Sequence, residues 1–263
     1  MDFPQSISFT ITNACNLRCQ MCGQWSQEGY IRSKPERLKG EMTLTDWKRL
    51  VDELADHHIS SLLLRGGEPF LFPGIIDLLQ YIHSKGLFTA IDTNGTQLKR
   101  YAEDIARIGK IHLTISLDGP AEIHDAVRGV KGTFARIRDG IHALNNCERI
   151  SGNPISKSFN FTICPYSIKG LGALPDAVRS LGLNSVAIVP YYFFPEAVGE
   201  AYAQEMQTAL DCSAYSWVGF HHESSGVDFE LFHSEYEKYL ANLKGVTDFP
   251  YMAFTEDQYR TWF

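Results

Sequence analysis

Residues 60–92 read SSLLLRGGEPFLFPGIIDLLQYIHSKGLFTAID, and this stretch decides the fold class. Ser60–Leu64 is a short apolar run of the kind found in buried strands, and Phe88–Asp92 repeats that character. Between them, Ile75–Lys85 has helical spacing, begins after Pro73 and stops before a glycine. A strand, a helix and a second strand in this order predict two parallel strands joined by a right-handed crossover.

The same alternation continues along the chain to about residue 190. The other expected strands are Ser6–Thr12, Ile111–Leu117, Ser158–Cys164 and Ser185–Pro190. The other expected helices are Thr45–His58, Gln97–Ile108, Thr133–Asn146 and Ile168–Leu181. The strands read as mostly apolar, as expected when helices cover a parallel sheet. Six such units build either a doubly wound open sheet or a barrel, and both place functional loops at the carboxyl ends of the strands.

Composition limits the function classes. The chain has 263 residues and a formal charge of −7, from 24 Lys and Arg against 31 Asp and Glu, which argues against a nucleic-acid surface built on bulk positive charge. No apolar run approaches the ~20 residues that cross a bilayer. The N-terminus, MDFPQSISFT, lacks the pattern of a secretory signal. We therefore expect a cytoplasmic protein, with no membrane and no nucleic acid among its partners, whose thiols stay reduced.

Three of the six cysteines lie within eight residues, in Cys15-Asn-Leu-Arg-Cys19-Gln-Met-Cys22. A disulfide framework would spread its cysteines, so this spacing indicates a metal site. Three thiolates can hold three irons of a cubane cluster and leave the fourth iron open to a small molecule. A zinc site would need a fourth ligand, and buried structural cysteines are the remaining alternative.

The C-x3-C-x2-C spacing resembles the signature of the radical S-adenosylmethionine (SAM) superfamily. The resemblance implies a [4Fe–4S] cluster whose open iron chelates SAM, which is cleaved to give a 5′-deoxyadenosyl radical. The residue before the last cysteine is often aromatic in that family and is Met21 here. Methionine still packs softly beside a cluster.

The ends of the next strands carry further motifs of the family. Gly66-Gly67-Glu68-Pro69 resembles its GGEP motif, which implies that Glu68 binds the SAM amino group; a tight turn is the alternative. Thr93 and Asn94 are implied to line the SAM pocket, or else form a turn.

The fourth strand ends in a longer motif, Ser116-Leu-Asp118-Gly119, followed by His124-Asp125 and Arg128-Gly129. It resembles the family pattern SLDG with a downstream HDxxRG. The implied roles are Ser116 toward the ribose or methionine part of SAM and Arg128 toward its carboxylate. His124 is interpreted as a surface or capping residue. This block resembles the SPASM/twitch-type subgroup, which includes sulfatase-maturing, peptide-modifying and haem-modifying enzymes.

Three later features have both a functional and an ordinary interpretation. Val189, at the end of the sixth strand, is implied to pack against adenine and is equally a core residue. Cys164 is a candidate hydrogen donor in radical chemistry or a small core residue. His221-His222-Glu223 resembles a metal triplet, but a solvated loop is favoured because adjacent side chains point apart.

The resemblance implies a partial (β/α)6 TIM-like barrel, with residues 1–190 as the catalytic core and 191–263 as a mostly helical extension. The extension holds the expected helices Glu196–Asp211 and Asp228–Leu243. The Cys-rich C-terminal module of the subgroup is not found in this sequence. The apolar end Tyr259–Phe263 suggests either a docked terminus or a chain cut from a longer parent.

The expected activity is hydrogen abstraction by the 5′-deoxyadenosyl radical, with electrons from a flavodoxin or ferredoxin-type donor. A peptide or protein side chain is the favoured substrate, by resemblance to the subgroup. A small molecule such as a tetrapyrrole is the alternative substrate. A non-catalytic iron–sulfur or zinc-binding module is the alternative of a different class.

Overall fold

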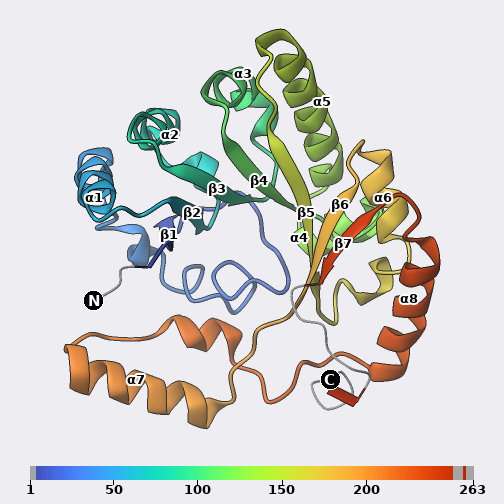
Figure 1. Ribbon diagram of the computed structural model, residues 1–263. Coiled ribbons are helices and arrows are strands. Elements are labelled where there is room, and N and C mark those ends of the chain that lie inside the picture. The colour runs from blue at the N-terminus through green and yellow to red at the C-terminus, as the bar shows by residue number, and fades with distance from the viewer. Residues whose placement is uncertain (1–3, 251–256, 259–263) are drawn as a thin grey trace.

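The protein is described by a computed structural model covering residues 4–250 and 257–258. Its centre is a parallel sheet in which every strand pairs with the next one in the chain, in the order β1-β2-β3-β4-β5-β6-β7 (Figure 1). The strands are β1 Ser6–Thr12, β2 Ser61–Gly66, β3 Phe88–Thr93, β4 Ile111–Ser116, β5 Ser156–Ile163, β6 Ser185–Pro190 and β7 Thr247–Pro250. The α/β class expected from the sequence is confirmed.

Helices form an arc around the outer side of the curved sheet, whereas α7 lies apart on the opposite, concave side (Figure 1). The helices are α1 Leu44–Asp56, α2 Ile75–Ser84, α3 Leu98–Ile108, α4 Ala121–Arg128, α5 Thr133–Ser151, α6 Leu174–Ser180, α7 Glu196–Leu210 and α8 Phe229–Asn242. Short 3-10 helices are Pro35–Leu38, Pro69–Leu71, Ile168–Gly170 and Ser216–Phe220. The long loop after β1 lies on the concave side, between the sheet and α7 (Figure 1).

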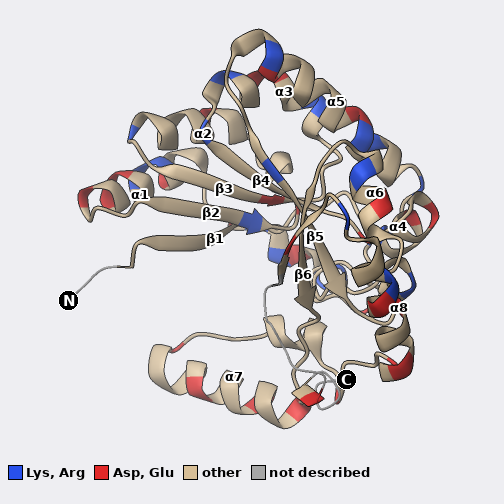
Figure 2. Ribbon diagram, turned by 45° about the vertical axis from the view of Figure 1, so that its right-hand side comes forward, with Lys and Arg blue, Asp and Glu red and all other residues tan. Residues whose placement is uncertain are grey.

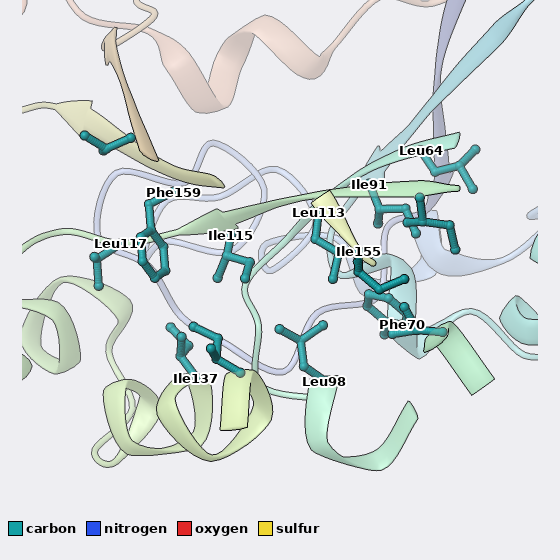
Figure 3. Close-up of a cluster of buried hydrophobic side chains, with 14 of the residues drawn as sticks. Leu64, Phe70, Ile91, Leu98, Leu113, Ile115, Leu117, Ile137, Ile155 and Phe159 are labelled. Carbon is teal, nitrogen blue, oxygen red and sulfur yellow. The ribbon is translucent and has the colours of Figure 1, made fainter. Parts of the chain in front are cut away.

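The main core lies between the sheet and its outer helices. In β4, Leu113 and Ile115 are fully buried and point toward Leu98 of α3 and Ile137 of α5 (Figure 3). These side chains belong to one continuous apolar cluster that extends from β1 to α8. Burial in this cluster determines which side chains of each strand point to the outer face. Because side chains alternate along a strand, the residues between them point to the inner face.

The inner face differs from the mostly apolar strands expected from the sequence. Burial alternates along β4, where Ile111, Leu113 and Ile115 are buried and the residues between them are partly exposed. The same alternation in β5 places Asn160 and Thr162 on the inner face. Helices cover only the outer face of this sheet, so the inner face keeps polar side chains that line cavities.

Three elements correct the sequence-based expectation. Helix α4 was not expected, although its sequence carries the downstream motif of the fourth strand. Strand β7 was not expected in a mostly helical extension; it pairs with β6 in the same sheet. The expected helix Ile168–Leu181 is divided into a 3-10 turn and α6. Pro175 has no N–H and would interrupt the interior of one long helix, but it is tolerated in the first turn of α6. Tyr259–Phe263 lies outside the described residues.

Charges of both signs alternate over the outer helices α1, α3 and α5 (Figure 2). Helix α7 carries glutamates and neither lysine nor arginine. The outer helices are therefore solvated faces of mixed charge. Among the residues that the structure describes, no helix combines the length and hydropathy of a membrane span.

Candidate active site

A cavity of about 230 Å³ lies where the first strands end. Its wall gathers most of the site residues expected from the sequence, namely Cys15, Cys19, Cys22, Gly66, Gly67, Thr93, Asn94, Ser116 and Arg128. It is completed by Leu17, Met21, Trp25, Arg65, Asp92 and Thr162. Residues as distant in the chain as Cys15 and Arg128 thus meet at one point, because parallel strands end at the same edge.

The three cysteines of the first cavity are free thiols. Cys19 is buried, and Cys15 and Cys22 are half-buried. Burial raises the pKa of Cys15 to about 11 and that of Cys19 to about 12. Because only the thiolate binds iron, these groups would have to release their protons to hold a cluster.

The last turn of α4 holds the cysteine loop in place. The Arg18 N–H donates to the carbonyl of Arg128 at 3.1 Å, and the Gln20 N–H donates to the carbonyl of Val127 at 2.9 Å. Carbonyls at a helix end have no partner within the helix, so they are available to the loop. Gly129 ends the helix at φ +70, with its Cα against the Arg18 carbonyl, where an added Cβ would lie 2.5 Å from the oxygen.

The two glycines after β2 are required by the chain itself. A Cβ at Gly66 would lie 2.2 Å from the Thr12 carbonyl oxygen, and one at Gly67 would lie 2.3 Å from the Ala14 carbonyl oxygen. Gly66 also has a φ of +146, which side chains disfavour. The glycine turn therefore packs directly against the start of the cysteine loop, in addition to lining the cavity.

Glu68 is fully buried and does not line the cavity. Its carboxylate accepts hydrogen bonds from the Asn94 N–H at 2.7 Å, the Thr93 hydroxyl at 2.8 Å and the Phe70 N–H at 3.1 Å. Burial outweighs these hydrogen bonds and raises its pKa to about 7. Glu68 therefore fixes the turn after β3, and its expected contact with the SAM amino group stays a prediction.

The turn after β3 also holds the cysteine loop in place. The Asn94 side-chain amide donates to Asn16 Oδ1 at 3.0 Å, and Asn94 Nδ2 lies 4.0 Å from Cys15 Sγ. The Asn16 amide donates back to the Thr96 hydroxyl at 2.9 Å. Asn16 and Thr96 were missed from the sequence because neither belongs to a recognised motif.

Arg128 and Asp118 form a buried, bidentate ion pair. Arg128 Nε and Nη2 donate to Asp118 Oδ2 and Oδ1 at 2.6 and 2.9 Å, while Nη1 points to Cys19 Sγ at 3.7 Å. Burial opposes ionisation of Asp118, but the guanidinium and His124 hold its pKa below the ordinary value. His124 is fully buried, with Nδ1 3.1 Å from Asp118 Oδ2, so its interpretation as a surface or capping residue was wrong.

A second cavity, of about 470 Å³, adjoins the first. The two share Met21, Arg65, Asp92 and Thr162 in their walls, and Val189 lines the second one. An Arg65 guanidinium nitrogen lies 3.4 Å from an Asp92 carboxylate oxygen, so an ion pair marks the junction. The remaining wall is polar along β4 and β5 and apolar or aromatic along β6, with Thr114, Asn160, Ala187, Pro190, Tyr191, Tyr192, Leu63 and Phe220.

Cys164 is placed away from both cavity walls. Its side chain is fully buried, and its sulfur lies 3.3 Å from the Ser167 hydroxyl. A hydrogen donor must reach the substrate, so this placement supports the alternative of a small core residue.

Residues 9–152 match the sequence model of the Radical SAM superfamily. The matched segment runs from β1 to the end of α5 and contains the cysteine loop, the glycine turn and α4. The chain belongs to the radical SAM superfamily. Radical SAM enzymes use a [4Fe–4S] cluster and SAM, and the donor set of three thiols on one cavity wall fits such a cluster.

Curated radical SAM relatives are named for two kinds of product. The chain is 30% identical over 174 residues to Fe-coproporphyrin III synthase of Methanosarcina barkeri, covering 66% of this chain and 40% of that protein. It is 33% identical over 150 residues to the antilisterial bacteriocin subtilosin biosynthesis protein AlbA of Bacillus subtilis, covering 55% of this chain and 32% of that protein. The chain thus spans less than half the length of these two relatives.

Solved radical SAM structures share the fold. The SAM-bound structure of Streptococcus suis SuiB superimposes with a TM-score of 0.64 at 16% identity, covering 97% of this chain and 55% of SuiB. The AdoMet-bound structure of anSMEcpe gives 0.63 at 16% identity, covering 92% of this chain and 59% of that chain.

The sequence His221-His222-Glu223 does not gather into a metal site. His222 Nε2 lies 3.1 Å from the Tyr191 hydroxyl, and His221 Nε2 lies 3.5 Å from a Glu223 oxygen. Within residues 4–250 and 257–258, no three His, Cys, Asp or Glu side chains converge on a point that could hold a single metal ion.

Proposed function

We propose that this chain cleaves SAM reductively at a [4Fe–4S] cluster held by Cys15, Cys19 and Cys22. The observation that carries the proposal is the first cavity, whose wall combines the three thiols with the residues expected to bind SAM. When bound, the cluster supplies an electron to the SAM sulfonium, and the resulting 5′-deoxyadenosyl radical abstracts a substrate hydrogen. An external flavodoxin or ferredoxin-type protein is the proposed electron donor.

The polar wall of the first cavity is proposed to hold SAM. Ser116 and Arg128 face the cavity with a hydroxyl and a guanidinium, which suit the ribose and the carboxylate. Gly66 and Gly67 leave room for the methionine part, and Thr93 and Asn94 close the side next to Cys15. We assign Glu68 to holding this wall through its three donors, and its Oε2, which accepts one of them, keeps acceptor capacity for the SAM amino group.

The second cavity is the proposed substrate site. It meets the first at Met21, Arg65, Asp92 and Thr162, so a radical formed in the first cavity has a short path to a substrate in the second. Val189 lines this cavity and not the first, so packing of adenine against Val189 requires the adenine end of SAM to extend past the junction of the two cavities. The aromatic side chains on one side of this cavity give a bound substrate an apolar surface to pack against.

The charges of the second cavity favour a peptide over a tetrapyrrole. Of its described lining residues, the charged ones are Arg65 and Asp92, and they pair with each other. A porphyrin precursor with several carboxylates would leave those charges without cationic partners, at a high desolvation cost. Neutral amides match the Thr114, Asn160 and Thr162 side chains, and an apolar side chain matches the aromatic wall. A tetrapyrrole precursor remains the second candidate, because several relatives are named as haem or coproporphyrin synthases.

The experiment is anaerobic reconstitution followed by addition of dithionite and SAM, with 5′-deoxyadenosine and methionine as products. Cys19→Ala should lose the cluster and both products. Cys147→Ala, which alters a half-buried cysteine on α5 outside both cavities, should retain them. Product formation by Cys19→Ala would contradict the ligand assignment.

The substrate class needs a separate arm of the experiment. Short peptides encoded beside the gene and Fe-coproporphyrin III are supplied in parallel reactions. A mass change in a peptide that accompanies 5′-deoxyadenosine formation supports the peptide proposal. Conversion of the porphyrin alone would replace it with the second candidate.

A further inference from the structure

The guanidinium of Arg128 divides its donors between two partners. Nε and Nη2 are bound to the Asp118 carboxylate at 2.6 and 2.9 Å, which leaves Nη1 directed at Cys19 Sγ at 3.7 Å. All three side chains are more than nine-tenths buried, which reduces screening of this arrangement by water. The donor to the sulfur is therefore charged and held at a fixed angle.

The Cys15 thiol has different surroundings. Cys15 Sγ has neutral donors, the Leu17 N–H at 3.5 Å and the Asn94 amide at 4.0 Å. In the described part of the chain, the sulfurs of Cys15, Cys19 and Cys22 receive one hydrogen bond from a cation, and it goes to Cys19. The arrangement thus singles out one of the three proposed cluster ligands.

Two further features hold Arg128 in this position. His124 Nδ1 lies 3.1 Å from Asp118 Oδ2 and 3.2 Å from the Asp118 backbone nitrogen, so the buried imidazole packs directly against Asp118 and limits its movement. The Arg128 carbonyl accepts from the Arg18 N–H, next to Cys19. The backbone and the guanidinium of one residue therefore both contact the cysteine loop, and the distance from Nη1 to Sγ is set by the fold.

Hydrogen bonds and net charge around the sulfurs set the reduction potential of an iron–sulfur cluster. Reduction adds one electron, supplied by the external donor, and makes the cluster more negative. A cationic donor at a ligand sulfur stabilises that extra negative charge. We propose that Arg128 raises the reduction potential of the cluster through Cys19, and that Asp118 and His124 are positioning residues that set the strength of this effect. This inference rests on the cluster ligands of the proposed function.

The charges of Arg128 and Asp118 are expected to shift the reduction potential of the cluster in opposite directions. Arg128→Gln removes the cation and keeps a neutral donor group, so the reduced cluster loses stabilisation. Asp118→Asn keeps the shape of the partner and removes the compensating negative charge, so the reduced cluster gains stabilisation. A residue pair with a merely structural role would shift both variants in the same direction or leave the potential unchanged.

The test is a redox titration of the reconstituted chain, followed by the low-temperature magnetic resonance signal of the reduced cluster, without SAM. At a fixed potential, Arg128→Gln should lower the ratio of reduced to oxidised cluster about tenfold, equivalent to about 59 mV for a one-electron couple. Asp118→Asn should raise that ratio. The matched control is Arg107→Gln, which removes an exposed positive charge on α3 and should leave the ratio unchanged.

Iron and sulfide content per chain separates the possible failures. If wild-type chain binds no [4Fe–4S] cluster, the proposed function itself fails. If wild-type and variants carry equal cluster and their potentials agree, or if both variants shift in the same direction, the role of Arg128 is overturned while the proposed function stands. Should Arg128→Gln fail to fold, Asp118→Asn decides alone, since a potential that does not rise contradicts the proposal.

Discussion

Glu68 carries a prediction whose size follows from its burial. The side chain is fully buried, and its pKa is raised from the ordinary 4.5 to about 7. A carboxyl with a higher pKa in the folded state binds its proton more tightly there than in the unfolded chain. The folded state is therefore favoured at low pH, and this contribution is lost as the pH rises through about 7.

The perturbation is Glu68→Gln, which keeps the shape and removes the titration. Between about pH 5 and about pH 8, the shift in pKa lowers the unfolding free energy of the wild type by about 2–3 kcal/mol. The side-chain amide that the substitution introduces would also face one of the three donors, a cost of about 1–3 kcal/mol. That cost does not depend on pH, so it cancels when the two pH values are compared.

The assay is urea unfolding of cluster-free, reduced protein at both pH values. The stability of Glu68→Gln relative to the wild type should rise by about 2–3 kcal/mol from about pH 5 to about pH 8. Glu103→Gln, at an exposed position on α3, is the matched control and should show no such change. A relative stability of Glu68→Gln that is equal at both pH values would refute the reasoning, because Glu68 would then be ionised throughout.

Two further substitutions test the contacts around the cysteine loop. Gly67→Ala places a Cβ 2.3 Å from the Ala14 carbonyl oxygen, so the unfolding free energy should fall by about 1–3 kcal/mol; an unchanged urea midpoint would show that the close approach is not real. Asn94→Ala removes the hydrogen bond to Asn16 and should weaken SAM binding about tenfold in calorimetry of reconstituted protein, a cost of about 1.4 kcal/mol; undiminished affinity would remove Asn94 from the site.

The sequence predicted the sheet well because its signals are local. Six strands and most outer helices follow from apolar runs with glycine and proline at their ends. Helix α4 is short and begins after Pro120 without a side-chain cap, so its sequence does not separate it from a loop. Strand β7 has four residues, and its place in the sheet depends on pairing with β6, which is a contact distant in sequence.

Site residues were predicted where they belong to a sequence motif. Their partners were missed where these depend on contacts between residues distant in sequence. The spacing of Cys15, Cys19 and Cys22 predicted that they act together, and the structure places all three on one cavity wall. The motif around Glu68 was found, but its partners depend on the turn after β3, 26 residues away for Asn94. His124 illustrates the same limit, since nothing local indicates that it packs against Asp118 in the interior.

The most direct test of the proposed function is the product of SAM cleavage by the anaerobically reconstituted chain. With dithionite present, 5′-deoxyadenosine and methionine should form in equal amounts, and neither should form without reductant. A chain that holds a full [4Fe–4S] cluster and binds SAM, yet leaves SAM intact, would contradict the proposal.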